Sequence, residues 1–235
     1  MNSETGMGLV YHFFAGTGST YDQTVKRWTL GLDGWWKSAI IRRIPLQPVR
    51  ILDQACGTGI LSFRMAQRYP RCRIIGVDLQ EEYLLCARKK QKMLRLDTVD
   101  FVLGRAEEIC LRLDFDCITS SYLAKYADLP ALVKNARNML KQNGVLIMHD
   151  FTYPSNVWSA QALECYFKLM QSLGKRWHYP EWHTIFRELP DLIRSTRWVG
   201  ELLAALQAHA FEDIAVTPLT FGASTIVTAR NVKPL

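Results

Sequence analysis

One stretch of the chain restricts the fold more than any other. A short apolar run, residues 49–55, leads through two glycines into a helical pattern at residues 60–69. A strand that gives way to Gly57 and Gly59 lets a ligand approach the backbone closely, and the helix that follows points its N-terminus at that ligand. A second apolar run, residues 72–79, leads into another helical pattern. Two strand–helix units in series predict a parallel, doubly wound α/β sheet.

The same alternation continues along the chain. Further strand patterns lie at residues 99–104, 115–122, 145–151, 213–220 and 223–230. Further helical patterns lie at residues 81–95, 129–141, 159–174 and 197–210, with a loop-like stretch, residues 175–185, that is dense in Trp and His. We therefore expect one Rossmann-like unit with extra helices at the N-terminus and before the last two strands.

Composition indicates which binding partners and which cellular location to expect. The net charge of +7 favours an acidic partner, either a membrane surface or a nucleic acid. No apolar run reaches the roughly 18 residues of a spanning helix, and the N-terminus lacks the pattern of a signal peptide. We expect a cytoplasmic protein, with membrane association left open. The six cysteines form no CxxC and no Cys/His cluster, so no metal site is predicted.

Two acidic residues indicate what the glycines bind. Asp78 ends the second strand about 20 residues after the glycines, where such folds hold the two hydroxyls of a ribose. A dinucleotide site would need a third glycine, and the chain has Ser62 there. Asp53, just before the glycines, suits an amino group better than a pyrophosphate. The pattern predicts a nucleoside with a cationic amino-acid tail, as in S-adenosylmethionine; the alternative is a simple tight turn.

Four segments together resemble the class I S-adenosylmethionine-dependent methyltransferases: residues 49–66, 74–90, 105–109 and 115–154. Within that class the chain is most similar to the ubiquinone/menaquinone biosynthesis C-methyltransferase family. The similarity extends to the N-terminal segment that ends in Tyr21-Asp22 and to the tail. It implies a seven-stranded mixed sheet whose last strand is antiparallel, with the cofactor at the C-terminal ends of the first strands.

The resemblance also implies a division of the single methyltransferase domain, residues 1–235. The expected parts are an N-terminal helical lid (1–48), a cofactor-binding core (49–154), a helical acceptor-side insertion (155–200), and a C-terminal helix and hairpin (201–235). The first glycine pair, residues 15–20, lacks a preceding strand and a later carboxylate, so we assign it to the lid. The expected cofactor-binding residues are Tyr21, Asp53, Ala55, Gly57, Gly59, Asp78, Leu79, Ala106, Glu107, Ser120 and Ser121.

Some positions depart from the family pattern, chiefly on the acceptor side. Arg105 stands where the family has Asp before Ala-Glu, so the adenine would depend on neighbouring backbone and Glu107. The segment 120–130 replaces the usual Gly-Leu-Arg-Asn stretch, and Ala-Gly-Phe is shortened to Ala210-Phe211. These changes weaken a quinone assignment more than they weaken the methyltransferase assignment.

Methyl transfer from a sulfonium needs positioning of the acceptor and a base to make it nucleophilic. The candidate catalytic residues are Asp150, Tyr122 and His178. Asp150 ends a strand but would serve equally well as a cap, and Tyr122 equally well as packing. His178, like His183, is a surface histidine on the simpler interpretation, and His149 is expected to be packed or exposed.

The leading hypothesis is C-methylation of a prenylated quinol or a related phenolic ring. Alternatives are a small-molecule O- or N-methyltransferase, a non-catalytic S-adenosylmethionine-binding protein and, less favoured, a nicotinamide-dependent oxidoreductase. Residues 120–123 lack the Asn/Asp-Pro-Pro-Tyr of enzymes that methylate base amines, which argues against nucleic acid as a partner. The expected partner is a small, lipophilic acceptor; tryptophans beside basic residues are compatible with a membrane interface. Homodimerisation is left open.

Overall fold

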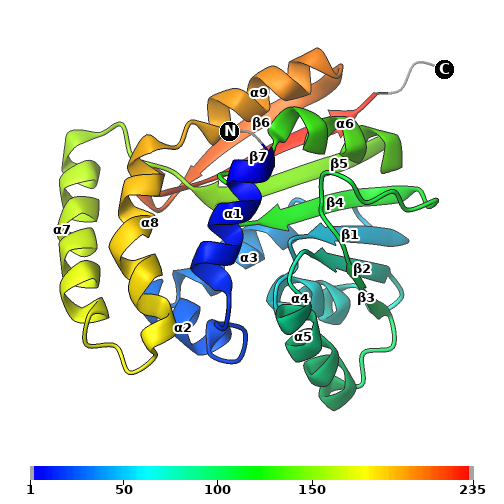
Figure 1. The fold of residues 1–235 in the computed structure, drawn as a ribbon. Coiled ribbons are helices and arrows are strands. Elements are labelled where there is room, and N and C mark those ends of the chain that lie inside the picture. Colours follow the sequence, from blue (N-terminus) through cyan, green and yellow to red (C-terminus); the bar gives the residue numbers. More distant parts are fainter. Residues whose placement is uncertain (1–2, 233–235) are drawn as a thin grey trace.

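The computed structural model describes residues 3–232. Its centre is a seven-stranded sheet of order β3-β2-β1-β4-β5-β7-β6, in which β1 to β5 run parallel and β7 is antiparallel to both of its neighbours (Figure 1). The predicted mixed sheet with an antiparallel last strand is confirmed. The strands are β1 (Arg50–Gln54), β2 (Arg73–Asp78), β3 (Val99–Leu103), β4 (Phe115–Ser121), β5 (Leu140–Phe151), β6 (Phe211–Leu219) and β7 (Ser224–Asn231).

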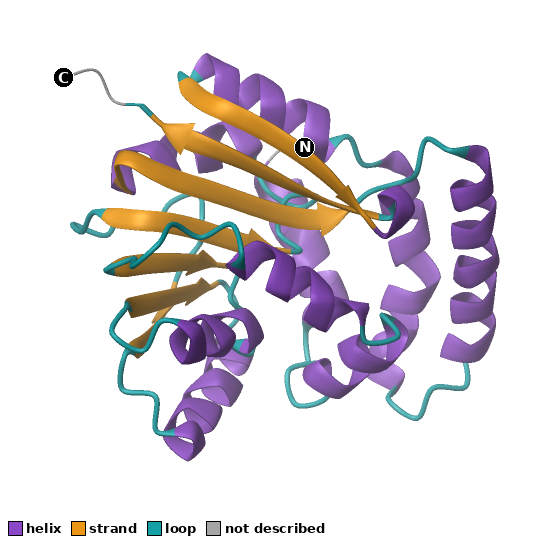
Figure 2. Cartoon of the chain, turned by 180° about the vertical axis from the view of Figure 1, so that it is seen from behind, coloured by secondary structure: helices purple, strands orange, loops and turns teal. Residues whose placement is uncertain are grey.

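Helices flank the sheet and extend beyond one end of it. They are α1 (Ser3–Phe14), α2 (Tyr21–Trp28), α3 (Leu32–Ile41), α4 (Ile60–Arg68), α5 (Glu81–Leu94), α6 (Leu129–Met139), α7 (Val157–Gly174), α8 (His183–Ser195) and α9 (Trp198–Ala208). Figures 1 and 2 both show α2, α7 and α8 grouped beside the sheet, away from α4 and α5. The helices expected before β1 and before β6 are therefore present.

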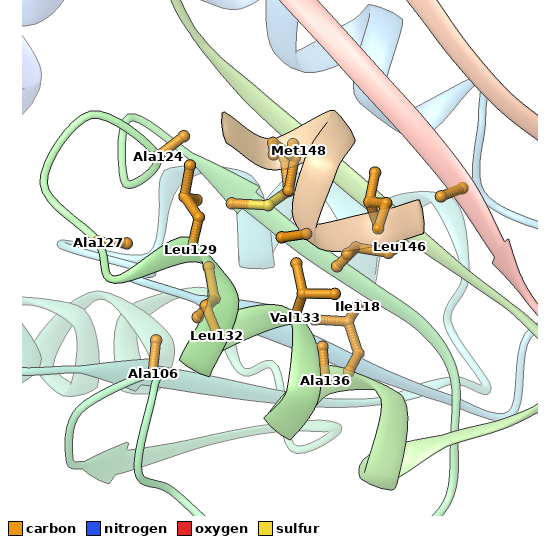
Figure 3. Close-up of a cluster of buried hydrophobic side chains, with 14 of the residues drawn as sticks. Ala106, Ile118, Ala124, Ala127, Leu129, Leu132, Val133, Ala136, Leu146 and Met148 are labelled. Atoms are coloured by element: carbon orange, nitrogen blue, oxygen red, sulfur yellow. The ribbon is translucent and has the colours of Figure 1, made fainter. Parts of the chain in front are cut away.

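Successive side chains of the central strands point to opposite faces of the sheet, and each face is covered by an apolar layer. On one face, Ile118 of β4 and Met148 of β5 pack with α6 and α9 (Figure 3). On the other face, Ile51 of β1 and Ile147 of β5 pack with α3, α4 and α5. Because both faces are covered, β1, β2 and β4 are buried over most of their length.

A third apolar cluster lies off the sheet. Phe13 of α1 packs with Phe167 of α7 and Phe186 of α8, and Tyr126 from the loop after β4 joins them. Trp182 donates its indole N–H to Thr20 Oγ1 at 2.9 Å, across 162 positions of sequence. The N-terminal helices and the α7–α8 segment thus form one packed layer, named here the cap layer.

Two local expectations differ from the structure. The helical pattern expected to reach residue 141 ends at Met139, and the residues before 145 form a bulge inside β5. The pairing of β5 with β4 shifts there, between Phe115 and Cys117, and Asn143 has a φ of 62°. The loop-like stretch is partly helical, since a 3₁₀ turn at Pro180–Trp182 leads directly into α8. Within residues 3–232, no helix is both long and apolar enough to cross a bilayer.

Candidate active site

The turn between β1 and α4 has the geometry that the glycines predict. Gly57 and Gly59 have φ of 57° and 84°, a left-handed conformation that side chains disfavour. Asp78, at the end of β2, accepts the backbone N–H of Gly57 at 2.7 Å and that of Gln80 at 2.9 Å. Each carboxylate oxygen keeps a further lone pair for a ligand. Burial raises the pKa of Asp78, because the carboxylate loses its hydration. The two backbone donors lower that pKa and so offset part of the rise.

A groove runs along the C-terminal ends of β1, β2 and β4. The groove has a volume of about 110 Å³ and is closed on its outer side by α1 and the start of α2. Among the predicted cofactor residues, the groove is lined by Tyr21, Ala55, Gly57, Asp78, Leu79, Ala106, Glu107 and Ser121. The structure therefore places eight of the eleven predicted cofactor-binding residues around one groove.

A small polar pocket continues the groove beneath Ala55 and Gly57. Asp53 lines this pocket and accepts hydrogen bonds from Ser62 at 2.5 Å and Thr119 at 3.0 Å. Burial raises the pKa of Asp53 to about 6, although these hydroxyl donors and the Lys37 ammonium oppose the rise. Lys37 lines the same pocket, so an anion and a cation stand side by side in it.

The first glycine pair is a docked loop. Glu82 of α5 accepts the backbone N–H of Gly16 at 2.9 Å and that of Gly18 at 2.7 Å. Thr17 is wholly buried and hydrogen-bonds the Tyr83 hydroxyl. The adjacent Asp22 is bound to Thr58 and Lys90, so it anchors the loop instead of lining the groove. An amide nest of this kind can hold a ligand anion; here a carboxylate of the same chain occupies it.

A second, larger cavity lies between the C-terminal ends of β4 and β5 and the cap layer. Its volume is about 300 Å³, and its walls are almost entirely aliphatic and aromatic. Lys125 is the one residue among its described lining that carries a formal charge. The lining is drawn from α1, α2, α3, α7 and α8 and from the loop after β4. The cap layer therefore creates an apolar chamber beside the groove.

The groove and the apolar chamber share a wall of four aromatic residues: Phe14, Tyr21, Tyr122 and Tyr126. Tyr21 and Tyr122 also line the small polar pocket, so all three spaces meet at these two rings. Tyr122 donates its hydroxyl to Asp33 at 2.8 Å and stacks on Phe151 with ring centroids 4.9 Å apart. Burial raises the pKa of Tyr122 well above its ordinary value, so this hydroxyl stays protonated.

Beneath that wall lies a buried ion pair. The Lys125 Nζ is 2.6 Å from Asp150 Oδ1, with 2% and 0% of the two side chains exposed. Asp150 also accepts the backbone N–H of Phe151 at 2.7 Å. Asp150 itself lines none of the three spaces; Lys125 stands between it and the chamber.

Several predicted residues lie elsewhere. Ser120 is buried on the opposite side of β4 from Ser121 and lines none of the three spaces, because successive strand residues point to opposite faces. Gly59 also lies outside the lining; it is the N-cap of α4, packed against Phe63. His178 is exposed and contacts Tyr179, with the two rings tilted and their centroids 3.9 Å apart. This candidate from the loop-like stretch does not line the chamber.

His149, which the sequence leaves either packed or exposed, is packed. It hydrogen-bonds Ser121 at 3.0 Å and Ser224 at 2.6 Å and has no exposed surface. Burial lowers its pKa well below the ordinary value, so the ring is neutral. Because Ser121 lines the groove, His149 fixes the orientation of a groove hydroxyl.

Two lysines were not singled out as site residues. Lys37 follows two tryptophans in sequence, and its side chain is 5% exposed and pairs with Asp33. Lys125 lies in the segment 120–130, which departs from the family pattern. The i, i+4 spacing of Asp33 and Lys37 was an available signal for their pairing; nothing local marks Lys125, whose partner is 25 positions away.

Comparison with known proteins identifies the class. A model of the methyltransferase domain family matches residues 47–191. A ubiquinone/menaquinone biosynthesis C-methyltransferase from Rickettsia peacockii is 30% identical over 177 residues, covering 72% of this chain and 71% of the relative. A demethylmenaquinone methyltransferase from Bacteroides fragilis is 26% identical, covering 94% and 92%.

Solved structures agree on the fold. The plantazolicin methyltransferase BpumL, crystallised with a substrate analogue and S-adenosylhomocysteine (SAH), superposes with a TM-score of 0.68 at 14% identity, covering 98% of this chain and 96% of that one. Geranyl diphosphate C-methyltransferase from Streptomyces coelicolor, also solved with SAH, gives 0.61 at 15% identity, covering 86% and 80%.

The matched domain and the fold define an S-adenosylmethionine-dependent methyltransferase, with S-adenosylmethionine as its cofactor. Within that class, the chain belongs to the ubiquinone/menaquinone biosynthesis C-methyltransferase family.

Proposed function

We propose that the enzyme methylates a ring carbon of a prenylated quinol, or of a related phenol with an apolar body. The observation that carries this proposal is the apolar chamber of about 300 Å³ that shares its aromatic wall with the cofactor groove. Acceptor sites are concave and mostly apolar, with few polar groups that fix orientation. The naming of relatives as quinone-pathway C-methyltransferases supports the same acceptor class.

The residues present fit the cofactor. Asp78, half-buried at the end of β2, would hold the ribose hydroxyls, and Leu79, Ala106 and Glu107 would border the adenine. In the polar pocket, Asp53 would attract the α-ammonium and Lys37 the α-carboxylate of the methionine tail. When bound, the cofactor supplies an electrophilic methyl group on a sulfonium.

The chain's own contribution is to position and desolvate the acceptor. Tyr21 and Tyr122 border both spaces and would hold the acceptor ring against the transferable methyl group while excluding water. Because its hydroxyl is protonated and already donated to Asp33, Tyr122 would act as a wall and not as a base. Asp150 is engaged with Lys125, so we assign it a positioning role.

A direct test is turnover of radiolabelled methyl donor with a panel of demethylated quinols that differ in tail length. We expect transfer to carbon, with KM falling as the tail lengthens and fills the chamber. Product analysis separates carbon from oxygen and nitrogen methylation. Transfer to phenolic oxygen or to an amine would replace this proposal with the O- or N-methyltransferase alternative. SAH binding without turnover on any acceptor would favour a non-catalytic binder.

We also infer peripheral membrane contact at the chamber mouth. Leu30 lines the chamber and is 77% exposed, and Phe221, 88% exposed, lies between two chamber-lining residues, Thr220 and Ala223. Of the tryptophans that suggested an interface, Trp36 and Trp182 are buried in the protein, whereas Trp35 and Trp158 are exposed. Exposed apolar side chains around an apolar opening suit a bilayer surface.

Co-sedimentation with anionic liposomes at low salt tests the contact. Phe221→Ser should reduce the bound fraction severalfold. The matched control is Leu46→Ser, since Leu46 is 91% exposed but lies outside the chamber lining. Equal binding by the two variants, or no binding by the native enzyme, would exclude docking through this mouth.

A further inference from the structure

The Lys125–Asp150 pair is fixed by backbone as well as by charge. Asp150 Oδ1 accepts the Lys125 ammonium at 2.6 Å, and Oδ2 accepts the backbone N–H of the same lysine at 3.2 Å. The carboxylate therefore holds both ends of Lys125. This double contact sets the position of Nζ at the chamber wall instead of leaving it to a flexible side chain.

The ammonium has hydrogen-bonding capacity left on its chamber side. Of its three N–H groups, one is donated to Asp150 and a second reaches the Tyr122 carbonyl at 3.4 Å. Its other described neighbours are ring faces: Tyr126 at 4.4 Å, Phe151 at 5.5 Å and Tyr122 at 5.6 Å from the ring centroids. One donor thus faces an aromatic chamber with no described oxygen to receive it.

Such a pair is poorly explained as a stabilising device. A buried ion pair costs desolvation that its attraction only partly offsets, and packed apolar residues in its place are often as stable. Here every other surface of the chamber is uncharged. A single cation at an apolar wall is the arrangement expected of a site for an apolar molecule that carries one anionic oxygen.

We propose that Lys125 Nζ binds the ionised phenolic oxygen of the acceptor, with Asp150 as the residue that positions it. This inference rests on the proposed function and specifies its substrate class: an aromatic ring with an acidic hydroxyl on an apolar body. On binding, the hydroxyl proton passes to water and the phenolate oxygen pairs with the ammonium. Its electron density is delocalised onto the ring carbon, which would form a bond to the methyl group as the methyl–sulfur bond of the cofactor breaks and SAH is left. The ring carbon would then lose its proton to water, which restores the aromatic ring.

The other ionisable groups near Lys125 do not replace it. His149 is neutral and turned to its two serines. The hydroxyls of Tyr122 and Tyr126 stay protonated, because burial raises their pKa values. Lys37 lies 4.9 Å from the Tyr122 ring centroid, on the polar-pocket side, and is paired with Asp33. Lys125 is therefore the cation that a chamber ligand would meet.

The test measures the ionisation of a bound phenol, not turnover. We suggest 4-nitro-1-naphthol, whose phenolate absorbs at longer wavelength than its phenol, titrated with pH on the SAH-loaded protein. In the native enzyme the bound phenol should have a pKa about one unit or more below that of the free phenol, because an opposite charge within about 4–6 Å favours ionisation.

The matched variant removes both charges together. Lys125→Met combined with Asp150→Asn leaves no lone buried charge, so the fold is retained, which thermal melting checks. In this double variant the bound phenol should have a pKa above the free value, because only an apolar wall remains. Lys125→Arg keeps a cation and should stay close to the native enzyme. Equal pKa values for the phenol in the native and double-variant proteins would overturn the proposal.

Asp150→Asn alone separates this proposal from a role for Asp150 as the base. With the cation kept and its counter-ion removed, the bound phenol should ionise at still lower pH than in the native enzyme. A carboxylate that itself attracted the phenolic proton would give the opposite sign, and that result would contradict the assignment.

Failure of this proposal is distinguishable from failure of the proposed function. Calorimetric titration of SAH reports the groove independently, and the quinol panel reports the acceptor. If the native and double-variant proteins bind SAH alike and the phenol pKa responds to Lys125, the anion subsite stands even when no quinol is methylated. If quinols are methylated and the phenol pKa does not respond, only the subsite is wrong.

Discussion

The Glu82 carboxylate of α5 receives the backbone N–H of Gly18 at 2.7 Å, across 64 positions of sequence. With the second bond, from Gly16, one side chain holds the loop that connects α1 to α2. Both helices contribute walls to the cofactor groove. The loop that resembles a nucleotide-binding turn is therefore the attachment point of the groove's outer wall.

Replacing Glu82 should loosen this attachment. In Glu82→Gln the charge and one of two strong acceptors are lost, at about 1.5 kcal/mol for hydrogen bonds to a charged group. Amide hydrogen exchange in residues 15–20 should accelerate about tenfold, as measured by mass spectrometry. Glu81→Gln is the control, because Glu81 is exposed and makes no described contact with the loop. Equal exchange in the two variants would contradict the anchoring role.

Removing the Asp78 carboxylate should weaken cofactor binding. We expect Asp78→Ala to reduce SAH affinity by about 1–3 kcal/mol, the cost of leaving hydroxyls and the Gly57 N–H without an acceptor. Calorimetry measures the affinity, and thermal melting separates it from unfolding. Asp100→Ala, at an exposed β3 position, removes a carboxylate that pairs with Arg73 and should leave affinity unchanged. Unchanged affinity in Asp78→Ala would remove Asp78 from the site.

Cofactor affinity should depend on pH through Asp53. Its pKa is raised to about 6, so the carboxylate is ionised above pH 6 and attracts an ammonium group. Below pH 6 it holds a proton, and SAH affinity should fall by up to about tenfold per pH unit. Titrations from pH 5 to 8 should show this slope in the native enzyme and a flat profile in Asp53→Asn. A slope that survives in the variant would assign it to another group.

The same carboxyl has a predictable effect on stability. Its folded pKa lies above the unfolded value, so the folded state binds the proton more tightly and Asp53 disfavours folding progressively as the pH rises through 6. A shift of about 2 pKa units corresponds to about 3 kcal/mol. At pH 8, Asp53→Asn should therefore melt no lower than the native enzyme, which shows that any lost affinity is not a loss of fold.

Gly59 should tolerate no side chain. Its φ is 84°, and a Cβ would stand 2.7 Å from the Phe63 ring. Gly59→Ala should cost about 2 kcal/mol through backbone strain and displacement of that ring, which lowers Tm by roughly 4–8 °C for a chain of this size. Gly200→Ala, in α9 with nothing near the added methyl group, should stabilise slightly instead. A Tm for Gly59→Ala equal to that of the native enzyme would refute the strain.

The cofactor half of the site could be predicted from sequence because its determinants are local. Gly57 follows β1 and Asp78 ends β2, and these two strands are parallel neighbours, so the two residues meet at the C-terminal ends of the strands. The resemblance also singled out Tyr21, which the structure places at the start of α2 in the lining of the groove.

The acceptor half could not be predicted in the same way. The chamber depends on where α8 meets α2, and these segments are about 160 positions apart, as the Thr20–Trp182 bond shows. Side-chain direction was a second obstacle: Ser120 and Ser121 look equivalent in sequence, and the strand turns only Ser121 toward the groove. Burial was the third obstacle. Asp150 and Lys125 form a buried ion pair only because the fold brings them together among aromatic rings, and neither residue marks this in the sequence.

The aromatic wall makes the two binding events thermodynamically linked. Phe14, Tyr21, Tyr122 and Tyr126 each have surface on both the groove and the chamber, so a ligand that orders these rings from one side changes the work required on the other. Linkage requires the effect to be reciprocal: the factor by which bound SAH alters acceptor affinity equals the factor by which acceptor alters SAH affinity. Any dependence of one affinity on the other can therefore pass through four side chains that form no covalent bond in the reaction.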